Sequence, residues 1–348
     1  MVRIAVVAGD GIGPEVIEAG IGVMEAAARD GSVDLEFTRF PWGCEYYLEH
    51  GRMMPEDALE TLRGFDEIYL GAVGWPTVPD HVSLWGLLIP MRRTFDQYVN
   101  LRPARILRGV RSPLSDPGEL DVTVVRENTE GEYSDSGGRL FHGTPQEVAI
   151  QDTVFTRRGL ERIIRYAFEL ATTRRQRVTG ATKSNGISIT MPFFDDVFRE
   201  ISEEYSGVEA ALMHADALAA RLILDPTSFD VVVASNLLGD LLSEVTAAVS
   251  GAIGIAPSAN LNPEGDHPSL FEPIHGSAPD IAGRGIANPS GAIWAAAMLL
   301  EHAGHPEVGT RIVEALEATL EGGTKTADLG GEASTEEFAG TVISRLDA

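Results

Sequence analysis

Short runs of β-branched residues alternate with helical segments along most of this chain, and this alternation restricts the fold more than any other feature. Runs typical of strands lie at residues 2–9, 35–40, 66–73, 120–127, 177–184 and 229–236, and helical patterns lie at 14–29, 155–173 and 190–205. The sequence "VVVA" at 231–234 is continuously apolar, as expected for a strand that is covered on both faces. The alternation therefore predicts an α/β protein with a mostly parallel sheet.

Length and charge narrow the class of protein further. The 348 residues are enough for two domains or for one large α/β unit. The net charge of −25 repels nucleic acid and anionic lipid, so neither is expected as a partner. Many acids with almost no lysine are typical of proteins from salt-rich surroundings, where screening is strong. A GC-rich genome would also replace lysine with arginine, but it would not explain the acidity.

Cysteine usage and hydropathy favour a cytoplasmic protein. Cys44 is the only cysteine, which excludes an intrachain disulfide and a cysteine-based zinc site. The N-terminal run reaches Gly9 and Asp10 too early for the apolar core of an export signal. The longest apolar stretch, residues 292–300, is too short to span a bilayer. We therefore expect a cytoplasmic location and no contact with a membrane.

Two acids follow the apolar strand at 231–234. Asp240 and Glu244 are four residues apart, so a helix presents both carboxylates on one face. Two oxygen donors at this spacing suit Mg²⁺ or Mn²⁺, which accept few protein carboxylates and keep positions for water and substrate. The alternative is an ordinary solvated acidic face. We expect the leucines of this helix to supply its buried side: Leu237, Leu238, Leu241 and Leu242.

Arginines form a second group of candidate site residues. Because a guanidinium binds a carboxylate with a two-pronged donor fork, several converging arginines indicate a di- or tricarboxylate ligand. The alternative is that they only offset the 52 acids on the surface. Arg92, Arg102 and Arg126 differ from ordinary surface arginines because they border predicted strands or turns.

Three further stretches have distinct patterns. The sequence "GDGIG" at 9–13 is a tight strand–helix turn whose glycine spacing differs from the G-x-G-x-x-G dinucleotide fingerprint. The long turn-rich loop within 272–291 carries His275, Asp280 and Asn288, and a loop of this length inside a compact domain is usually functional. Residues 137–153 look like a hairpin excursion.

Motifs along the whole chain resemble the β-decarboxylating dehydrogenases, the family of the isocitrate, isopropylmalate, homoisocitrate and tartrate/D-malate dehydrogenases. They run in family order from "GDGIGPEV" to "TADLGG". The tartrate/D-malate branch is most similar, through stretches such as "CEYYLEHGRMMP", "VRENTEGEY" and "IAPSANLNPE". The resemblance implies two α/β domains that flank a cleft, with a mostly parallel sheet and a fold distinct from the standard Rossmann fold.

The resemblance also assigns roles to individual residues. It implies that Arg92, Arg102 and Arg126 bind the substrate carboxylates and that Tyr133 donates a proton. It further implies that Lys183 is the general base and that Asp216 and Asp240 are metal ligands. Glu244 stands where the family has a second aspartate, so its contact with the metal is direct or through water. The chain has only two lysines, Lys183 and Lys325, and a base explains why position 183 is not arginine, since a guanidinium effectively never releases its proton.

The loop after residue 272 would bind the cofactor. The resemblance implies that these residues contact it: His275, Gly276, Ser277, Ala278, Asp280 and Asn288. Asp280 stands where NAD-using members have an acid that accepts hydrogen bonds from the adenosine ribose. NADP-using members have Lys and Tyr at the positions of Asp280 and Ile281, and a carboxylate there would repel a 2′-phosphate. NAD is therefore expected, together with Mg²⁺ or Mn²⁺, and a requirement for a monovalent cation is left open.

The segment before Arg92 faces the C3 group of the substrate in the family. Isocitrate-type members have Ser and Asn where this chain has Gly86 and Leu88, so an extra carboxylate would have no partner here. Isopropylmalate-type members have an acid where this chain has Trp85, whose bulk would fill the space of an isopropyl group. We expect D-malate, converted to pyruvate and CO₂, as first substrate and tartrate as second. The alternatives are 3-isopropylmalate dehydrogenase and, remotely, a non-catalytic nucleotide- or carboxylate-binding protein.

The resemblance finally predicts how the chain is divided and assembled. We place domain 1, which binds the cofactor, at 1–100 plus 255–348, and domain 2, which holds the metal and substrate, at 101–254. The expected assembly is a homodimer, with a tetramer as the alternative. In it Lys183 and Asp216 act across the subunit interface, and the 137–153 hairpin is the clasp.

Overall fold

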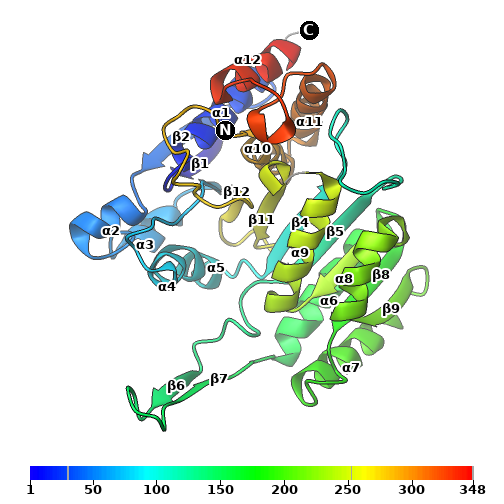
Figure 1. Ribbon diagram of the computed structural model, residues 1–348. Helices are drawn as coiled ribbons and strands as arrows, with labels where there is room; N and C mark the ends of the chain where they lie inside the picture. The colour runs from blue at the N-terminus through cyan, green and yellow to red at the C-terminus, as the bar shows by residue number, and fades with distance from the viewer. Residues whose placement is uncertain (30, 252, 347–348) are drawn as a thin grey trace. The chain divides into compact units, whose positions relative to one another are not determined.

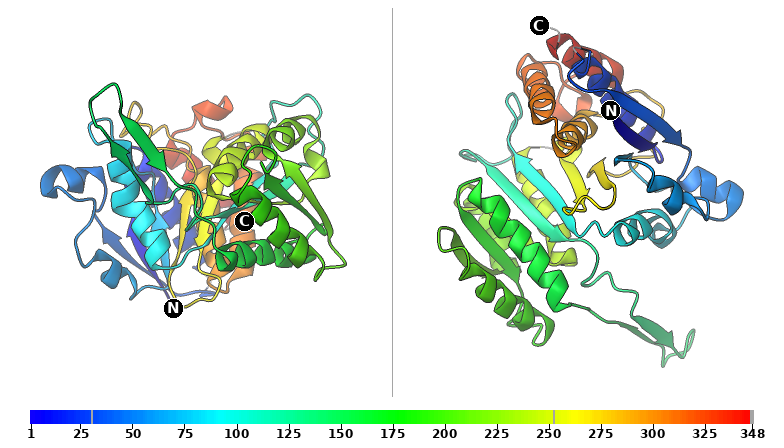
Figure 2. Two further views of the ribbon diagram at one scale, coloured as in Figure 1. Left: turned by 90° about the horizontal axis from the view of Figure 1, so that it is seen from below. Right: turned by 180° about the vertical axis from the view of Figure 1, so that it is seen from behind.

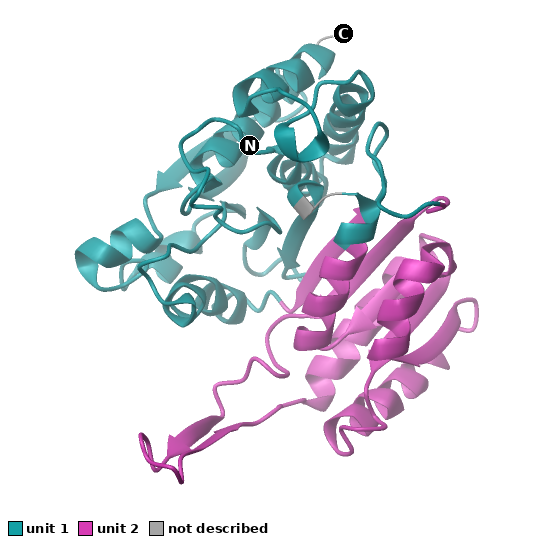
Figure 3. Ribbon diagram, in the orientation of Figure 1, with its two compact units in different colours: residues 1–97, 105–115, 247–348 teal, residues 98–104, 116–246 magenta. Residues whose placement is uncertain are grey.

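The chain forms two compact α/β units, shown in Figure 3. The computed structural model describes residues 1–29, 31–251 and 253–346 and is drawn in Figure 1 and, from two further directions, in Figure 2. Unit 1 consists of residues 1–97, 105–115 and 247–348, and unit 2 consists of residues 98–104 and 116–246. The chain therefore enters unit 1 three times.

The described part of unit 1 contains five strands in the order β2-β1-β3-β12-β11. They are β1 (Val2–Val7), β2 (Leu35–Phe40), β3 (Glu67–Leu70), β11 (Pro257–Leu261) and β12 (Ser269–Pro273). The pairs β1–β2, β1–β3 and β3–β12 are parallel, whereas β11 and β12 pair antiparallel. Because β1, β3 and β12 are parallel neighbours, the turn after β1 and the loop after β12 meet at one edge of the sheet.

The helices of unit 1 form where the sequence has an apolar face, and some of them carry proline in the first turn. Pro14 and Pro306 stand in the first turns of α1 and α11, where a missing N–H costs nothing. The bounds are α1 (Gly13–Ala27), α2 (Cys44–His50), α3 (Ala58–Leu62), α4 (Asp80–Ser83), the π-helical turn η1 (Leu84–Leu88), α5 (Ile89–Thr94), η3 (Ile253–Ile255), α10 (Ser290–His302), α11 (Pro306–Glu321), η4 (Ala327–Leu329) and α12 (Thr335–Leu346). Helix α10 is apolar on nearly every side and forms the centre of this unit.

Unit 2 has a sheet in the order β4-β5-β10-β8-β9. The strands are β4 (Val99–Arg105), β5 (Asp121–Glu127), β8 (Arg177–Thr182), β9 (Glu209–His214) and β10 (Val231–Ala234). The pairs β5–β10, β10–β8 and β8–β9 are all parallel. A parallel sheet directs the carboxyl ends of its strands to one edge, which is where Arg126 and the start of α9 lie.

Helices cover both faces of this sheet, as the two opposite views in Figures 1 and 2 show. They are α6 (Arg157–Thr172), α7 (Thr190–Ser202), α8 (Ala215–Leu224), the 3₁₀ turn η2 (Pro226–Ser228) and α9 (Asn236–Ser250). Val124, Val232 and Leu242 share one core with α8, whereas Phe168 of α6 and Phe198 of α7 contact each other on the opposite side, with tilted rings. Strand residues alternate between these two layers, which explains why β10 is wholly apolar.

A two-stranded hairpin projects from the rest of unit 2 (Figure 1). It consists of β6 (Gly137–Leu140) and β7 (Val148–Gln151), which pair antiparallel, so the predicted hairpin is confirmed as a local structure. Every residue of both strands is exposed. A pair of strands without a covered face is marginally stable by itself in water.

The predicted domain boundaries at 100/101 and 254/255 stay predictions. The two divisions of the chain differ most at residues 105–115, which belong to unit 1. Arg105 and Arg108 attach this segment to Glu317 of α11, at N···O distances of 3.2 and 2.9 Å. Within the described part of the chain, no helix is both long enough and apolar enough to cross a membrane.

Candidate active site

Helix α9 presents its first acid directly beside Arg126. A Cβ atom added to Gly239 would lie 2.7 Å from Cβ of Arg126, so only glycine allows the helix to pack this close to the end of β5. Asp240 follows, and its carboxylate pairs with the Arg126 guanidinium, which is 2% exposed. The Gly-Asp junction is therefore the reason that this carboxylate meets a buried cation.

Four side chains form a network around Asp240, which we call the Asp240 cluster: Arg102, Arg126, Tyr133 and Asp240. Nη1 of Arg102 lies 3.2 Å from Oδ1 of Asp240, and the Tyr133 hydroxyl donates to Oδ2 at 3.2 Å. The Arg126 guanidinium carbon also lies 5.5 Å from the centre of the Tyr133 ring. The two guanidinium groups that bind the Asp240 carboxylate are also of the type that binds the carboxylates of an anionic ligand.

Glu244 lies one turn further along α9 and is held more loosely. Its Oε1 is 3.8 Å from Nη1 of Arg102, and the side chain is 45% exposed. Partial burial raises the pKa of Glu244, and the nearby Asp240 carboxylate raises it further, against the lowering effects of Arg102 and Arg126. A divalent cation near both acids would relieve the repulsion between them.

The leucines of α9 do not all lie on the buried side, so that expectation is wrong for two of them. Leu242 is buried and Leu238 packs partly against the same core. Leu237 and Leu241 are exposed, by 37% and 57%. Because helix positions advance by about 100°, Leu237 lies on the same face as Asp240 and Glu244.

Lys183 and Asp216 form a separate pair in unit 2. Nζ of Lys183 lies 2.9 Å from Oδ1 of Asp216, and the lysine lowers the pKa of this carboxyl by a hydrogen bond. Among the described residues, no three side chains of His, Cys, Asp or Glu are grouped so that they could hold a metal ion. A single chain therefore does not bring Asp216 together with Asp240 and Glu244 as a ligand set.

Arg92, the third predicted substrate arginine, belongs to unit 1. It lies in α5, is 6% exposed, and its Nη2 donates to Oε1 of Glu272 at 3.2 Å. Asn260 donates to the same oxygen at 2.8 Å. The Nε–H group of Arg92 is buried without an acceptor in the described part of the chain. An unpaired buried donor is uncommon in proteins and often marks a position that a ligand fills.

The segment before Arg92 contains a π-helical turn, Leu84–Leu88, a local form that is frequent at functional sites. Trp85 lies in this turn with the Arg93 guanidinium carbon 5.1 Å from its ring centre, and Leu88 packs against the unit 1 core. A Cβ atom on Gly86 would lie 2.6 Å from Cγ of Met53. Close packing therefore explains why the position carries no side chain.

The "GDGIG" turn packs against the predicted cofactor loop. Gly11 has φ +61°, and a Cβ atom there would lie 1.9 Å from the Ser277 carbonyl oxygen. The next amide, that of Ile12, donates to the same carbonyl oxygen at 2.8 Å. The glycines thus allow the turn after β1 and the loop after β12 to touch through their backbones.

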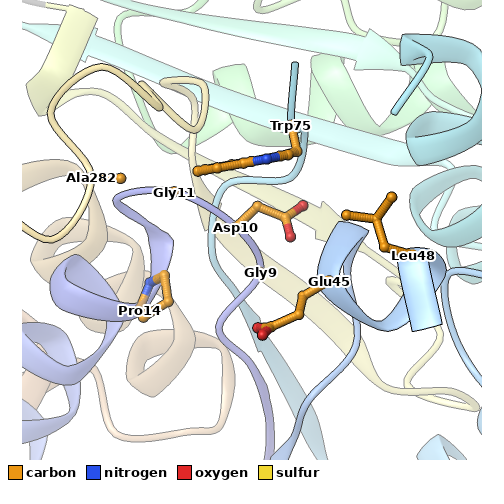
Figure 4. A pocket seen from close by; sticks show the side chains of 8 residues that line it. All are labelled: Gly9, Asp10, Gly11, Pro14, Glu45, Leu48, Trp75 and Ala282. Atoms are coloured by element: carbon orange, nitrogen blue, oxygen red, sulfur yellow. The ribbon is translucent and has the colours of Figure 1, made fainter. Parts of the chain in front are cut away.

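A pocket of about 440 Å³ opens beside this contact, entirely within unit 1 (Figure 4). Figure 4 shows the Trp75 ring above the Gly9–Gly11 turn, with Glu45 and Leu48 reaching in from α2. Asp10 also lines the pocket, and its carboxylate is held in place by hydrogen bonds that it accepts from the amides of Cys44 and Gly74, both at 2.8 Å. The pocket thus combines a flat aromatic face, a helix N-terminus and the predicted cofactor loop, all of which suit a nucleotide.

The predicted cofactor residues differ in how completely they are paired. Asn288 is buried, donating to Asp328 at 2.9 Å and accepting from the Ser290 amide at 2.9 Å. His275 has a buried Nε2 without a partner among the described residues, and burial lowers the pKa of its imidazole. Asp280 and Gly276, which belong to the same loop, are both exposed. Ala278 adopts φ +39°, a conformation that non-glycine residues rarely take.

Several residues that hold the predicted site residues in place were not expected from the sequence. Oδ1 of Asn236 accepts from Nε and Nη2 of Arg126, at 3.1 and 2.7 Å. Glu272 pairs with Arg92 as described, and Glu132 accepts two hydrogen bonds from the start of α9. The only signal in the sequence is that each of them stands next to a strand end or a predicted site residue.

Known proteins with related sequences and structures resemble this chain over its full length. Residues 3–342 match the family described as isocitrate/isopropylmalate dehydrogenase. The chain is 54% identical over 350 residues to an Escherichia coli (strain K12) protein named D-malate dehydrogenase [decarboxylating], which covers 98% of this chain and 97% of the relative. It is 52% identical over 346 residues to a Bacillus subtilis (strain 168) protein named probable tartrate dehydrogenase/decarboxylase, covering 99% and 98%.

The structural comparison gives the same picture at lower sequence identity. The crystal structure of isocitrate dehydrogenase from Methylococcus capsulatus superimposes with a TM-score of 0.91 at 33% identity, covering 100% of both chains. A β-decarboxylating dehydrogenase from Thermococcus kodakarensis gives a TM-score of 0.82 at 36% identity, covering 100% of this chain and 96% of the other.

Proposed function

The chain belongs to the isocitrate/isopropylmalate dehydrogenase family, and from this premise we propose that it oxidises D-malate to pyruvate and CO₂, with tartrate as a second substrate. The observation that carries the choice of substrate is the segment Trp85–Leu88. Within it, Gly86 and Leu88 offer no side-chain donor for an extra carboxylate, and Gly86 is packed against Met53. The names of relatives more than 50% identical support the same choice.

The arginines supply the recognition of the substrate carboxylates. Arg102 and Arg126 are buried and already pair with a carboxylate in the Asp240 cluster, so their donors are oriented before any ligand binds. Arg92 has a buried Nε–H donor without an acceptor among the described residues, and we propose it as a further group that binds a substrate carboxylate. Each carboxylate of a small dicarboxylate has the acceptors that a guanidinium fork requires.

The donor set fits a divalent metal once a second chain contributes. Asp240 and Glu244 are hard oxygen donors one helical turn apart, and Mg²⁺ and Mn²⁺ prefer such ligands. In one chain Asp216 pairs with Lys183 instead, so we propose that Asp216 of a partner subunit completes the ligand set. The metal would polarise the substrate oxygens as a Lewis acid, and a bound nicotinamide cofactor would accept the hydride.

Lys183 and Tyr133 would move the two protons of the reaction. Nζ of Lys183 would accept the proton of the substrate hydroxyl during oxidation at C2. In one chain Nζ of Lys183 lies 2.9 Å from Oδ1 of Asp216, so this carboxylate holds the side chain of the proposed base in place. After CO₂ leaves, the hydroxyl of Tyr133 would deliver a proton to the carbon that carried the carboxylate.

We propose NAD as the cofactor and the unit 1 pocket as part of its site. The exposed carboxylate of Asp280 can accept hydrogen bonds from ribose hydroxyls and repels a 2′-phosphate. The unpaired Nε2 of His275 provides a further polar contact, and Trp75 provides a flat apolar face.

A homodimer is the assembly that we propose, in the cytoplasm. In the β6–β7 hairpin the side chains of Leu140, Phe141, Val148 and Ile150 are exposed by 43–66% each. Large apolar side chains that are grouped and exposed in this way often mark an interaction site. The exposed Leu237 and Leu241 adjoin the acids of α9, so a partner that covers them would also approach the proposed metal ligands. The hairpin would then be the clasp between subunits, and a tetramer is the alternative.

A substrate panel tests the proposal. Wild-type protein is mixed with Mn²⁺, NAD⁺ and either D-malate, tartrate, isocitrate or 3-isopropylmalate, and NADH absorbance is followed. We expect the highest kcat/KM with D-malate and no activity after chelation of divalent metal. Equal or higher efficiency with 3-isopropylmalate would contradict the substrate assignment, and no NADH with any of the four acids would favour a non-catalytic binding protein.

A further inference from the structure

The loop that carries Tyr133 is attached to helix α9 at two points. At the first point, Oε1 of Glu132 accepts from the Ser235 hydroxyl at 2.8 Å, and Oε2 accepts from the Leu237 amide at 3.0 Å. At the second point, the Tyr133 hydroxyl donates to Asp240 at 3.2 Å. Consecutive residues of the loop therefore hold the start of the helix and its first acid.

The position of Glu132 suits this contact electrostatically. The first amides of a helix have no partner within the helix, and the positive end of its dipole favours a carboxylate. Ser235 and Leu237 flank Asn236, the first residue of α9, so Glu132 caps this helix from a distant part of the chain. A carboxylate that accepts two hydrogen bonds fixes both the loop and the helix end.

Neighbouring residues make the attachment rigid. Asn236 donates to the backbone oxygen of Glu130 at 3.1 Å, and its own oxygen accepts from Arg126. Gly131 exchanges two backbone hydrogen bonds with Val154, at 2.9 and 3.1 Å. Gln151 donates to the backbone oxygen of Glu132 at 2.8 Å. The Glu132 side chain is thus the direct link between this braced loop and α9.

We propose that Glu132 is a positioning residue that sets where the Tyr133 hydroxyl lies relative to Asp240. This inference rests on the proposed function, in which Tyr133 delivers the proton after CO₂ is lost. Proton delivery requires the donor to be within hydrogen-bond reach of the carbon, and a displacement of about 1 Å can cost about 100-fold in rate. Hydride transfer uses Lys183 instead, so loss of Glu132 separates the two halves of the reaction.

The experiment measures the two halves separately in Glu132→Ala and in wild type. Oxidation is followed as NADH formed from D-malate in a single turnover, and decarboxylation is followed as pyruvate formed from added oxaloacetate with Mn²⁺ and NADH present. We expect Glu132→Ala to keep the oxidation rate within about threefold and to lose about 10- to 100-fold in decarboxylation. Oxaloacetate should then accumulate during turnover of D-malate.

Matched variants distinguish positioning from a general loss of structure. Ser235→Ala removes only one of the two hydrogen bonds and should shift the ratio of the two rates in the same direction by a smaller factor. Glu132→Gln keeps the side-chain size and one acceptor, so it repeats the test if the alanine variant fails to fold. Glu204→Ala removes an exposed carboxylate that pairs with Arg165 and should leave the ratio unchanged.

The outcomes separate this inference from the proposed function. An active wild type together with an unchanged ratio of oxidation to decarboxylation in both Glu132 variants would overturn the positioning role alone. An equal fall of both rates would also overturn it, because that is the pattern of a structural residue. A wild type without activity on any of the four hydroxy acids would overturn the proposed function and this inference together.

Discussion

The Asp240 cluster of unit 2 and the cofactor loop of unit 1 hold their charged groups in opposite ways. Arg102, Arg126 and Tyr133 all contact Asp240, and the two arginines are buried. In the loop, Asp280 is exposed and Nε2 of His275 lacks a partner among the described residues. The cluster is therefore organised before ligands bind, whereas the loop keeps the Asp280 carboxylate and Nε2 of His275 available for a ligand.

We therefore expect substitutions in the Asp240 cluster to be costly and substitutions in the cofactor loop to change ligand specificity. In the cluster, removal of one group leaves a buried charge without its partner, which is expensive. In the loop, an exposed group can be exchanged with little effect on packing, so the change acts mainly on the choice of ligand. Substitutions of buried and of exposed groups measure this contrast.

Lys183→Met should have the largest effect. It removes the proposed proton acceptor and leaves an unbranched side chain only one atom shorter, so hydride transfer should fall by about 10²- to 10⁴-fold. NADH binding should change by no more than about threefold, since unit 1 is unaltered. Stopped-flow NADH formation and fluorescence titration of NADH measure the two quantities. Turnover within tenfold of wild type would remove Lys183 from the mechanism.

Arg126→Lys tests the organised cluster directly. The ammonium group cannot make the forked contact with Asp240 and Asn236, so kcat/KM for D-malate should fall by about 100-fold. The matched control is Arg165→Lys, which alters an exposed pair with Glu204 in the same unit and should change kcat/KM by less than about twofold. Similar losses in the two variants would contradict the contrast between buried and exposed arginines.

Asp280→Lys combined with Ile281→Tyr tests the open loop. A cation in place of the exposed carboxylate should attract a 2′-phosphate, so the ratio of kcat/KM for NADP⁺ over NAD⁺ should rise by about 10- to 100-fold. The melting temperature should stay within about 2 °C of wild type, because neither side chain is buried. Efficient use of NADP⁺ by the wild type would show that Asp280 does not select the cofactor.

Glu127→Gln tests a buried acid beside Arg126 and should have the smallest effect. Burial raises the pKa of Glu127 to about 7 from an ordinary value of 4.5, although it accepts hydrogen bonds from Thr129 and Glu130. The folded chain therefore keeps a proton that the unfolded chain has lost between these values, and stability falls as pH rises through about 7. The variant cannot titrate there.

Melting temperatures at pH 5 and pH 8 provide the measurement. Wild type should lose about 2–4 °C more than Glu127→Gln over this interval, apart from the change common to both proteins. Parallel curves for the two proteins would show that the Glu127 carboxyl does not take up a proton on folding.

Local sequence patterns predicted most of the fold. All six predicted strands and all three predicted helical stretches are present, and the fold class and family are confirmed by the full-length relatives. The strands that the patterns did not indicate have unusual compositions. Strand β9 reads "EAALMH", with residues that favour helices, and β4 contains Pro103. Pairing with neighbouring strands overrides these local preferences.

Residue types and their spacing along the chain are enough to show which chemical groups are available. The spacing of Asp240 and Glu244, the arginines at strand ends and the retained Lys183 are visible as patterns, because they depend on helix geometry and residue type alone. The roles assigned to these residues remain predictions that the experiments above address.

Which of these groups meet depends on the three-dimensional arrangement of the strands and helices. Arg126 and Asp240 are 114 residues apart, and they touch because β5 and β10 are parallel neighbours and Gly239 allows close packing. Lys183 pairs with Asp216 because β8 and β9 are neighbours, so Asp216 does not join the other acids within one chain. Strand order follows from burial of the whole sheet, and no local pattern encodes it, which is the physical reason that these partners could not be predicted.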